Sequence, residues 1–229
     1  MSENDTKAGL PFGVTDYYRS LSRIEDPQLD PIAAQYEPRT EEGHRLPYET
    51  SDPIGDAQYA VTKRLVHHYR DRALLLVCDR CATYCRHCFR RHFTGNSSGK
   101  ISPRELQEAA AYIRDHEEVQ EVLLSGGDPL MLSDRELEVI LQTLRGVRET
   151  LVFRICSRIP VVLPKRITEP LAELLGSYLP AWFVTHANHP GEITPEFERA
   201  VRRLGQQGVV TMNQSVLLRG VNDNPEVLE

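Results

Sequence analysis

The chain has 229 residues, of which 40% are hydrophobic and 26% are charged, as is ordinary for a soluble globular protein. Its 33 acidic and 27 basic side chains give a net charge of -6, which argues against bulk nucleic-acid binding because that requires a basic surface. No apolar run approaches the roughly 20 residues of a membrane helix, and residues 1–9 lack the apolar stretch of a secretory signal. We therefore expect a cytoplasmic protein that acts away from membranes.

The N-terminal segment, residues 1–52, is expected to form an arm, and residues 53–229 the main domain. Pro, Asp and Glu are frequent in the arm, and no apolar periodicity persists there. An irregular segment wrapped on the main domain fits this composition. The segment from Tyr59 to Tyr69 is predicted to form a short helix.

From Ala73 onward, short apolar runs alternate with helical patterns. Each run is flanked by turn residues, which is typical of buried parallel strands. The five predicted strands are Ala73–Val77, Val119–Leu124, Leu151–Ile155, Ala181–Val184 and Val209–Leu218.

Three amphipathic helices are predicted between these strands. Two begin with a capping box and the third with a Thr-Pro pair, and Gly208 is placed to end the third. The capping residues are Ser102, Ser133 and Thr194. The apolar stripes are Leu106, Ala109, Ala110 and Ile113; Leu137, Ile140, Leu141 and Leu144; and Phe197, Ala200, Val201 and Leu204. We interpret these stripes as core packing.

Repeated strand–helix units with right-handed crossovers predict an α/β fold with a parallel sheet, either open or curled into a barrel. In such sheets, functional groups lie where strands end and loops begin. Polar or reactive residues occur at or near the end of each predicted strand. We expect these residues to meet at one edge of the sheet.

Four of the five cysteines, Cys78, Cys81, Cys85 and Cys88, lie within eleven residues after the first predicted strand, and Cys156 stands alone. So tight a cluster in a cytosolic chain indicates metal binding or catalysis instead of a disulfide framework. Four thiolates would hold a structural zinc ion. Three would hold an iron–sulfur cluster with one iron open to a ligand. The spacing leaves both open, and Cys78 also fits a packed thiol at a strand end.

Polar residues mark the ends of the other four strands. In Ser125-Gly126-Gly127-Asp128, the glycines let backbone approach a ligand closely and the acid is placed to meet an amino group, although such a sequence is also an ordinary turn. Buried polar groups need partners, and a polar ligand is one candidate. The other polar residues are Arg154, Ser157 and Arg158, then Thr185, His186, Asn188 and His189, and finally Asn213, Gln214 and Ser215.

The spacing Cys81-x3-Cys85-x2-Cys88, after the first strand of a strand–helix series, resembles the radical S-adenosylmethionine (radical SAM) enzymes. Residues 53 to about 223 are similar to the lysine 2,3-aminomutase family within that group. The similar segments are Arg72–Val77, Tyr84–Cys88, Arg90-Arg91, Ser125–Asp128, Ser157–Pro164, Arg166-Ile167, Thr185-His186, Asn188–Pro190, Glu192–Thr194 and Asn213–Asp223. The resemblance implies a partial (β/α)6 TIM-like half-barrel of the radical SAM type.

The resemblance also implies the chemistry. Cys81, Cys85 and Cys88 would ligate three irons of a [4Fe-4S] cluster, and S-adenosylmethionine would bind the fourth. An electron from a donor such as flavodoxin or ferredoxin would release a 5′-deoxyadenosyl radical. That radical would take a hydrogen from an amino acid held on pyridoxal phosphate, and the amino group would move from carbon 2 to carbon 3. The resemblance leaves a homo-oligomer open.

Individual roles follow from the same resemblance. The Ser125–Asp128 loop would hold the methionyl amino group of S-adenosylmethionine, with His186 and Gln214 nearby. Arg90, two positions after the last cluster cysteine, would pair with the substrate carboxylate, which suits its planar fork.

The phosphate of pyridoxal phosphate would meet Arg72 and His68, a weaker and pH-dependent partner than the basic residue of the family. After Asn222-Asp223, family members continue with further strand and helix and a segment that carries the lysine for pyridoxal phosphate. The resemblance therefore implies a C-terminally truncated member with five of the six strand–helix units and an uncovered edge strand. Pro225 would open a helix that only four residues continue.

Three interpretations of the function are open. The chain is a truncated aminomutase-like enzyme that keeps the cluster site. Alternatively, it is a complete radical enzyme acting on a lysyl residue of a translation elongation factor, because Phe89–Phe93 resembles that branch of the family. The third interpretation is a non-catalytic domain that binds zinc through all four clustered cysteines.

Overall fold

The computed structural model of the chain describes residues 10–27, 29–44, 46–95 and 99–228; residues 1–9 of the expected arm lie outside the described residues. Its strands are β1 (Leu65–Tyr69), β2 (Arg72–Cys78), β3 (Glu121–Gly126), β4 (Val152–Cys156), β5 (Ala181–Thr185) and β6 (Val210–Asn213). They form one sheet in chain order, in which β1 is antiparallel to β2 and the other four pairings are parallel. The expected α/β half-barrel of five parallel strands is confirmed.

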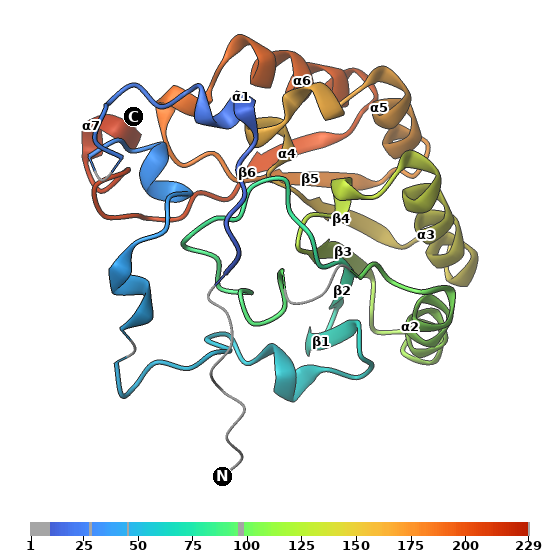
Figure 1. Cartoon of the computed structure of the whole chain (residues 1–229). Coiled ribbons are helices and arrows are strands. Elements are labelled where there is room, and N and C mark those ends of the chain that lie inside the picture. The colour runs from blue at the N-terminus through green and yellow to red at the C-terminus, as the bar shows by residue number, and fades with distance from the viewer. Residues whose placement is uncertain (1–9, 28, 45, 96–98, 229) are drawn as a thin grey trace.

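Four helices cover the outer side of this curved sheet. Figure 1 shows α2, α3, α5 and α6 side by side there, while the arm and the loop after β2 lie across the inner side. The helices are α1 (Asp16–Arg19), α2 (Pro103–Asp115), α3 (Asp134–Val147), α4 (Ile159–Val162), α5 (Glu169–Gly176), α6 (Pro195–Gln206) and α7 (Pro225–Leu228). Short 3-10 turns span Ala33–Gln35, Thr40–Gly43, Asp56–Tyr59, Pro129–Met131, Pro164–Arg166 and Pro190–Glu192.

The predicted helix starts are confirmed, and α2 shows why. The Ser102 hydroxyl accepts a hydrogen bond from the Glu105 N–H at 3.2 Å, and the Glu105 carboxylate accepts one from the Ser102 N–H at 2.8 Å. The predicted stripes of α2 and α3 are buried. In α6 the stripe is less complete, because Phe197 and Val201 are only half-buried. Gly208 follows α6 with a φ of 78°, which suits glycine at a helix end.

Successive residues of β2 enter two different hydrophobic clusters. Ala73, Leu75 and Val77 belong to the large cluster that also contains most of the buried stripe residues of α2, α3 and α6. Leu74 and Leu76 belong to a small cluster on the opposite face of the sheet. Because side chains alternate along a strand, β2 is buried on both faces, which explains its continuous apolar sequence.

The predicted helix from Tyr59 to Tyr69 is wrong. The chain forms a 3-10 turn over Asp56–Tyr59 and then the strand β1, which is hydrogen-bonded to β2. Leu65 and Val66 are buried against β2, opposite Leu75 and Leu74. The strand is therefore stabilised by pairing with a neighbour, a contribution that local sequence does not reveal.

The last predicted strand, Val209–Leu218, is shorter than expected, since β6 ends at Asn213. Asn213, Gln214 and Ser215 are exposed, so the prediction of buried polar groups is wrong. Within the described residues β6 pairs with β5 alone, which leaves its other side uncovered, as predicted. Beyond β6, the chain enters a loop held by buried Asn222, whose amide donates to the Ser215 hydroxyl at 3.2 Å.

The arm shares the main hydrophobic core. Tyr18, Ile32, Ala33 and Tyr36 are buried in the same large cluster as the sheet and its helices. The division at residue 52 therefore stays a prediction, because one core contains residues from both sides of it. Of the described helices, none has the length and apolar character needed to cross a membrane.

Candidate active site

A cavity of about 470 Å³ lies on the inner side of the sheet. Its volume falls within the range of small-molecule and cofactor sites. The residues to which the family resemblance gives a role all line this cavity, whereas six other polar residues near the strand ends, Ser157, Thr185, Asn188, His189, Asn213 and Ser215, do not. The lining residues with such a role are His68, Arg72, Cys81, Cys85, Cys88, Arg90, Ser125, Gly126, Gly127, Asp128, His186 and Gln214.

Strand alternation explains which sheet residues face the cavity. Arg72 and Leu74 in β2, Leu123 and Ser125 in β3, and Arg154 and Cys156 in β4 line it in pairs that are two residues apart, and Ala73 and Gly126 also border it. From the sequence, Arg154 was expected only as a polar residue near a strand end, and Cys156 was separate from the cysteine cluster. The period of two along β4 is the signal that links Cys156 to the cavity.

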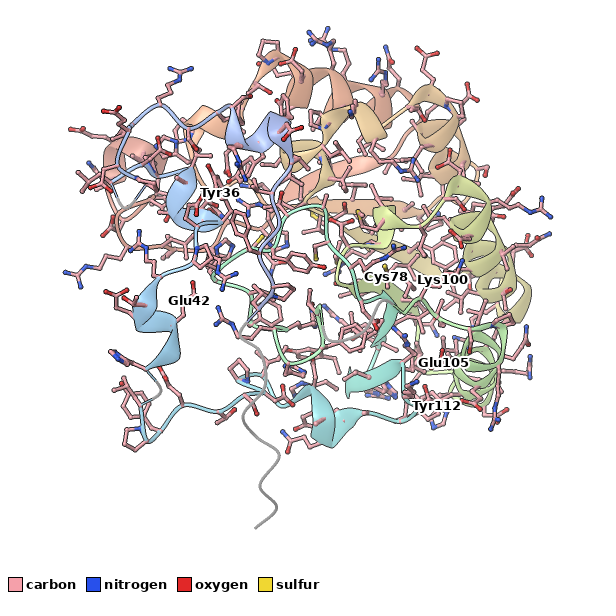
Figure 2. All side chains as sticks on the ribbon, in the orientation of Figure 1. Tyr36, Glu42, Cys78, Lys100, Glu105 and Tyr112 are labelled. Atoms are coloured by element: carbon pink, nitrogen blue, oxygen red, sulfur yellow. The ribbon has the colours of Figure 1, made fainter. Side chains whose placement is uncertain are left out.

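The loop after β2, which carries the clustered cysteines, is built against the arm. The Tyr84 N–H donates to the Gly13 carbonyl and the Arg86 N–H donates to the Gln35 carbonyl, each at 2.9 Å. The Arg86 guanidinium forms a two-pronged ion pair with Glu42, with N···O distances of 2.8 and 2.5 Å. Glu42 projects from the arm toward this loop (Figure 2). The arm therefore supplies backbone and side-chain partners that the cysteine loop needs.

Three of the four clustered thiols reach the cavity. Cys81, Cys85 and Cys88 line it, and burial raises the pKa of Cys81 and Cys88, so these thiols hold their protons until a metal displaces them. Cys78 is fully buried at the end of β2 and does not line the cavity. It lies beside Lys100, with which it forms an isolated antiparallel bridge (Figure 2). Its environment is that of a packed thiol.

The spacing of the loop thiols bears on the kind of metal centre. Two ligands of one zinc ion, each at about 2.3 Å, lie no more than about 4.6 Å apart. In the described part of the chain, the group whose ligand atoms all lie within 4.8 Å of one another is Asp52, Asp56 and His92, not the cysteines. Soft donors held farther apart fit a cluster of several irons, in which each thiolate binds its own iron.

The loop after β3 packs on the start of the cysteine loop. The Gly127 N–H donates to the Cys78 carbonyl at 2.6 Å, and the Asp128 N–H donates to the Arg80 carbonyl at 2.8 Å. A Cβ atom on Gly126 would lie 2.4 Å from the Cys78 carbonyl oxygen, and one on Gly127 would lie 2.4 Å from that of Arg80. The close approach that the glycines allow is thus to the protein's own backbone.

Asp128 joins this loop to the loop after β4. Its buried carboxylate accepts hydrogen bonds from the Leu130 N–H at 2.9 Å, the Ser157 hydroxyl at 2.8 Å and the Arg158 N–H at 2.9 Å. Burial raises the pKa of Asp128 to about 6 despite these bonds. The carboxylate therefore fixes the relative positions of two loops that border the cavity.

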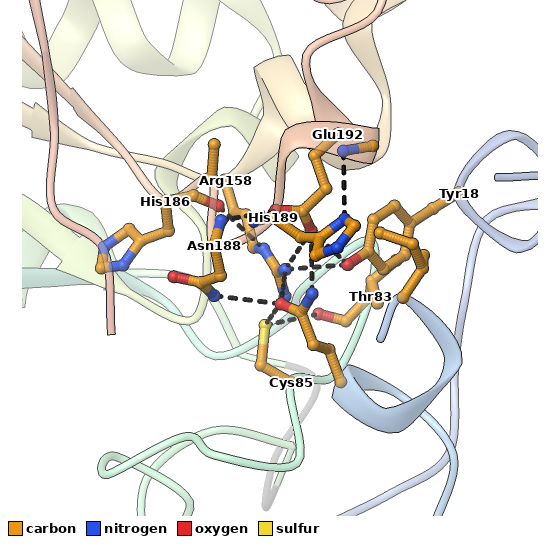
Figure 3. Close-up of polar contacts among 12 residues, drawn as sticks. Tyr18, Thr83, Cys85, Arg158, His186, Asn188, His189 and Glu192 are labelled. Atoms are coloured by element: carbon orange, nitrogen blue, oxygen red, sulfur yellow. Dashed lines mark hydrogen bonds and ion pairs between the residues drawn. The ribbon is translucent and has the colours of Figure 1, made fainter. Parts of the chain in front are cut away.

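Arg158 is the centre of a buried polar network beside Cys85 (Figure 3). Its Nη1 lies 2.8 Å from Cys85 Sγ, and its Nη2 lies 2.9 Å from the Tyr18 hydroxyl and 2.8 Å from Glu192 Oε1. Nη2 also contacts the side-chain oxygen of Gln35. The sequence marked Arg158 as a polar residue near a strand end, but it gave no indication that two arm residues would meet it.

Two histidines complete the cavity wall near this network. Burial, with a further contribution from nearby Arg158, lowers the pKa of His87 to about 3 and that of His186 to about 4. Both imidazoles are therefore neutral at pH 7. His87 lies between two cysteines of the cluster motif, and its position in the sequence does not by itself indicate a role in the cavity.

Arg90 is held at the cavity by an acidic residue. Its Nε donates to Asp56 Oδ2 at 3.0 Å, and its guanidinium carbon lies 4.6 Å from the centre of the Phe89 ring. Asp52 in turn accepts the N–H groups of Asp56 and Ala57 at 3.0 and 2.8 Å. The carboxylates of Asp56 and Asp52 therefore both bond to groups of the protein itself.

Further cations line the cavity. Arg72 pairs with Asp71 at 3.0 Å, and Arg154 forms a two-pronged ion pair with Glu121 at 2.9 and 2.8 Å. His68 is exposed and stacks on Tyr59 with ring centres 3.7 Å apart. Arg72 and Arg154 suit an anionic group such as a phosphate. Among the described residues that line the cavity, there is no lysine to bind pyridoxal phosphate covalently.

The protein-family model of the radical SAM superfamily matches residues 75–229, which include the cysteine loop and the five parallel strands except the first residues of β2. The chain belongs to the radical SAM superfamily. Membership of this superfamily implies a [4Fe-4S] cluster and S-adenosylmethionine, and the loop thiols and the cavity fit both.

Within the radical SAM superfamily, the chain is similar to curated enzymes named L-lysine 2,3-aminomutase. It is 43% identical to that of Acetoanaerobium sticklandii and 44% identical to that of Clostridium subterminale, over 96% of this chain and 53% of each relative. It is 42% identical to that of Escherichia coli (strain K12), over 87% of this chain and 58% of the relative. The chain thus spans about half the length of the curated relatives it matches.

Proposed function

We propose that this chain is the radical SAM part of an isomerase of the lysine 2,3-aminomutase type, which moves an amino group from carbon 2 to carbon 3 of an amino acid. The observation that carries the proposal is that three cysteine thiols and Arg90 line one cavity, inside a fold that belongs to the radical SAM superfamily. The names of the similar enzymes support a free amino acid as substrate over a lysyl side chain of a protein. The zinc-domain interpretation has no such support.

In this proposal Cys81, Cys85 and Cys88 bind three irons of the cluster as thiolates. When bound, the cluster and S-adenosylmethionine supply one-electron radical chemistry. The protein orients these groups through the cysteine loop, which is bonded to the arm, and through the loops after β3 and β4, which Asp128 joins. Cys78 takes no part as a ligand.

The polar residues of the cavity divide between the two small molecules. The loop from Ser125 to Asp128 offers acceptors to the methionyl amino group, and His186 and Gln214 border the same ligand. Arg90 binds the carboxylate of the amino acid, and Asp56 keeps its guanidinium in place at 3.0 Å. A planar guanidinium that is already anchored on one side loses little freedom when it binds a carboxylate on another.

A third group, pyridoxal phosphate, belongs to the proposal only through its phosphate. Arg72 and Arg154 are the cations that would bind this phosphate, with His68 as a pH-dependent neighbour. Within the described residues, no lysine lines the cavity to bind pyridoxal phosphate covalently. The electron donor, of the flavodoxin or ferredoxin kind, the cytoplasmic location and assembly into a homo-oligomer are further parts of this proposal.

The test is anaerobic reconstitution of the chain with iron and sulfide, followed by measurement of bound iron. We expect about four irons per chain for the unaltered protein, with far less in Cys81→Ala, Cys85→Ala and Cys88→Ala. Cys156→Ala is the matched control, because Cys156 also lines the cavity but lies in β4 outside the loop. Equal iron in all four variants would overturn the assignment.

The second measurement is formation of 5′-deoxyadenosine from S-adenosylmethionine with dithionite as reductant. Its appearance would support the cofactor site in this chain. Comparison of free L-lysine with a lysyl peptide as additive then separates the two kinds of substrate. Zinc binding without cluster formation would favour the structural-metal interpretation.

A further inference from the structure

We propose that Arg158 is a positioning residue for the iron–sulfur cluster, which donates a hydrogen bond to the sulfur of Cys85 and raises the reduction potential of the cluster, and that the N-terminal arm holds Arg158 in this orientation. The inference rests on the proposed function in one respect, namely that Cys85 is a cluster ligand. It adds a role for residues outside the cysteine motif, two of which, Tyr18 and Gln35, belong to the arm.

Arg158 is buried beside the cysteine loop. Its side chain is only 8% exposed, so its charge is buried and must be matched by partners. Nη1 lies 2.8 Å from Cys85 Sγ, and Nε donates to the His186 carbonyl at 3.1 Å. Since a guanidinium is planar and carries five N–H groups in a fixed fork, bonds at Nε and Nη2 determine where Nη1 points.

Glu192, which is fully buried, anchors this guanidinium fork. One of its oxygens lies 2.8 Å from Arg158 Nη2. The other accepts the N–H groups of Asn188 and His189 at 2.5 and 3.0 Å. Glu192 therefore cannot rotate away, and it fixes the guanidinium against the loop after β5.

The N-terminal arm supplies two further contacts to Arg158 (Figure 3). The hydroxyl of Tyr18, in α1, lies 2.9 Å from Arg158 Nη2, and its ring packs against the guanidinium, whose carbon lies 5.1 Å from the ring centre. Gln35 accepts hydrogen bonds from both Arg158 and the amide of Asn188, the latter at 3.0 Å. Two residues from a segment far away in the sequence thus complete the shell of acceptors around one arginine.

The electrostatic consequence follows from the charges. The charges of Arg158 and Glu192 compensate each other in the buried ion pair. Once Cys85 becomes a thiolate ligand, the guanidinium faces added negative charge at 2.8 Å. Reduction adds one more electron to the cluster, so a hydrogen-bond donor and positive charge at this sulfur favour the reduced state.

A purely structural role for this network is the competing explanation. In that case, changes to Arg158 would lower stability without moving the potential of the cluster. The two explanations are separated by an EPR-monitored redox titration of the reconstituted protein, with thermal unfolding measured in parallel. Bound iron per chain is measured for every sample.

The main variant is Arg158→Lys, which keeps a positive charge for Glu192 but cannot bond to Cys85, Glu192 and the arm at once. We expect the ratio of reduced to oxidised cluster at a fixed potential to fall about tenfold, which corresponds to about 59 mV for one electron. The matched control is Arg148→Lys. Arg148 also donates to several carbonyls, those of Val119, Ile113 and His116, but far from the cysteine loop.

The second variant is Tyr18→Phe, which keeps the buried ring and removes only the hydroxyl that contacts Arg158 and its anchor Glu192. We expect a shift of the same sign and about threefold in the same ratio, with iron content unchanged. This variant decides the question if Arg158→Lys fails to fold. Unchanged potentials together with lowered unfolding temperatures would overturn the inference. Absence of iron from the unaltered protein would instead overturn the proposed function.

Discussion

Arg90 Nε lies 3.0 Å from Asp56 Oδ2, although the two residues are 34 positions apart in the chain. Their side chains are 18% and 10% exposed, so the ion pair is largely withdrawn from water. Asp56→Asn leaves the guanidinium without its counter-charge, and we expect the free energy of unfolding to fall by about 2 kcal/mol. Urea unfolding of the metal-free chain measures this value.

The control for Asp56→Asn is Glu108→Gln. Glu108 pairs with Arg104 at 2.9 Å on the surface of α2, where the arginine side chain is 88% exposed. Exposed pairs of this kind contribute little, so we expect a change below about 0.5 kcal/mol. Equal effects of the two substitutions would contradict the buried pairing of Arg90.

Cys78→Ala tests the distinction between the packed thiol and the three cavity thiols. Cys78 is fully buried at the end of β2, so truncation leaves a small void. We expect a loss of about 1 kcal/mol in the free energy of unfolding and no loss of bound iron after reconstitution. Iron content that falls as far as in Cys81→Ala would make Cys78 a ligand.

Gly127→Ala is expected to disrupt the contact between the β3 loop and the cysteine loop. The new Cβ would lie 2.4 Å from the Arg80 carbonyl oxygen, and backbone on both sides leaves no flexible atom to yield. We expect a cost of about 3 kcal/mol. Gly146→Ala in α3 is the control, since nothing lies within 4 Å of its added methyl group. That substitution is expected to stabilise the helix by about 0.5–1 kcal/mol.

Glu105 gives the chain a pH-dependent contribution to stability. Partial burial opposes its ionisation, but the Ser102 N–H and the Lys63 ammonium outweigh burial and hold the pKa of Glu105 at about 2, below its ordinary 4.5. A lowered carboxyl pKa stabilises the fold above pH 4.5, and this contribution is lost as the pH falls toward 2. Glu105→Gln keeps the capping geometry and removes the charge.

The expected result for Glu105→Gln is a loss of about 1 kcal/mol at pH 7 that shrinks to nothing near pH 2. Parallel urea titrations of both proteins across this pH range measure the difference. A constant difference at every pH would show that the charge of Glu105 is irrelevant to stability.

Local signals were enough to predict α2 and β2, but not β1. The start of α2 is encoded by Ser102 and Glu105, which bond to each other within one turn. β2 is a continuous apolar run that is buried on both faces. β1 has the composition of a short amphipathic segment, and only its hydrogen bonds to β2 make it a strand. The length of β6 was overestimated for a related reason, since apolar residues continue past Asn213 into a loop.

The cavity residues were predictable to the extent that strand ends and motif spacing locate them. Arg158 was visible as a polar residue, yet its partners Tyr18 and Gln35 were not, because their side chains reach it from an arm with no regular pattern. Contacts between residues more than 100 positions apart leave no periodic signal in the sequence. The sequence suggested that Gly126 and Gly127 let the backbone approach a ligand. In the structure they instead allow close contact with the backbone of the cysteine loop.

The bond between Tyr18 and Glu192 joins residues 174 positions apart, and this separation has a consequence for biosynthesis. At about 5–20 residues per second, about 9 to 35 s pass between the synthesis of Tyr18 and that of Glu192. During this interval the arm leaves the ribosome without its final partner. The polar network that joins Tyr18, Arg158 and Glu192 is therefore complete only after the chain has been synthesised beyond β5.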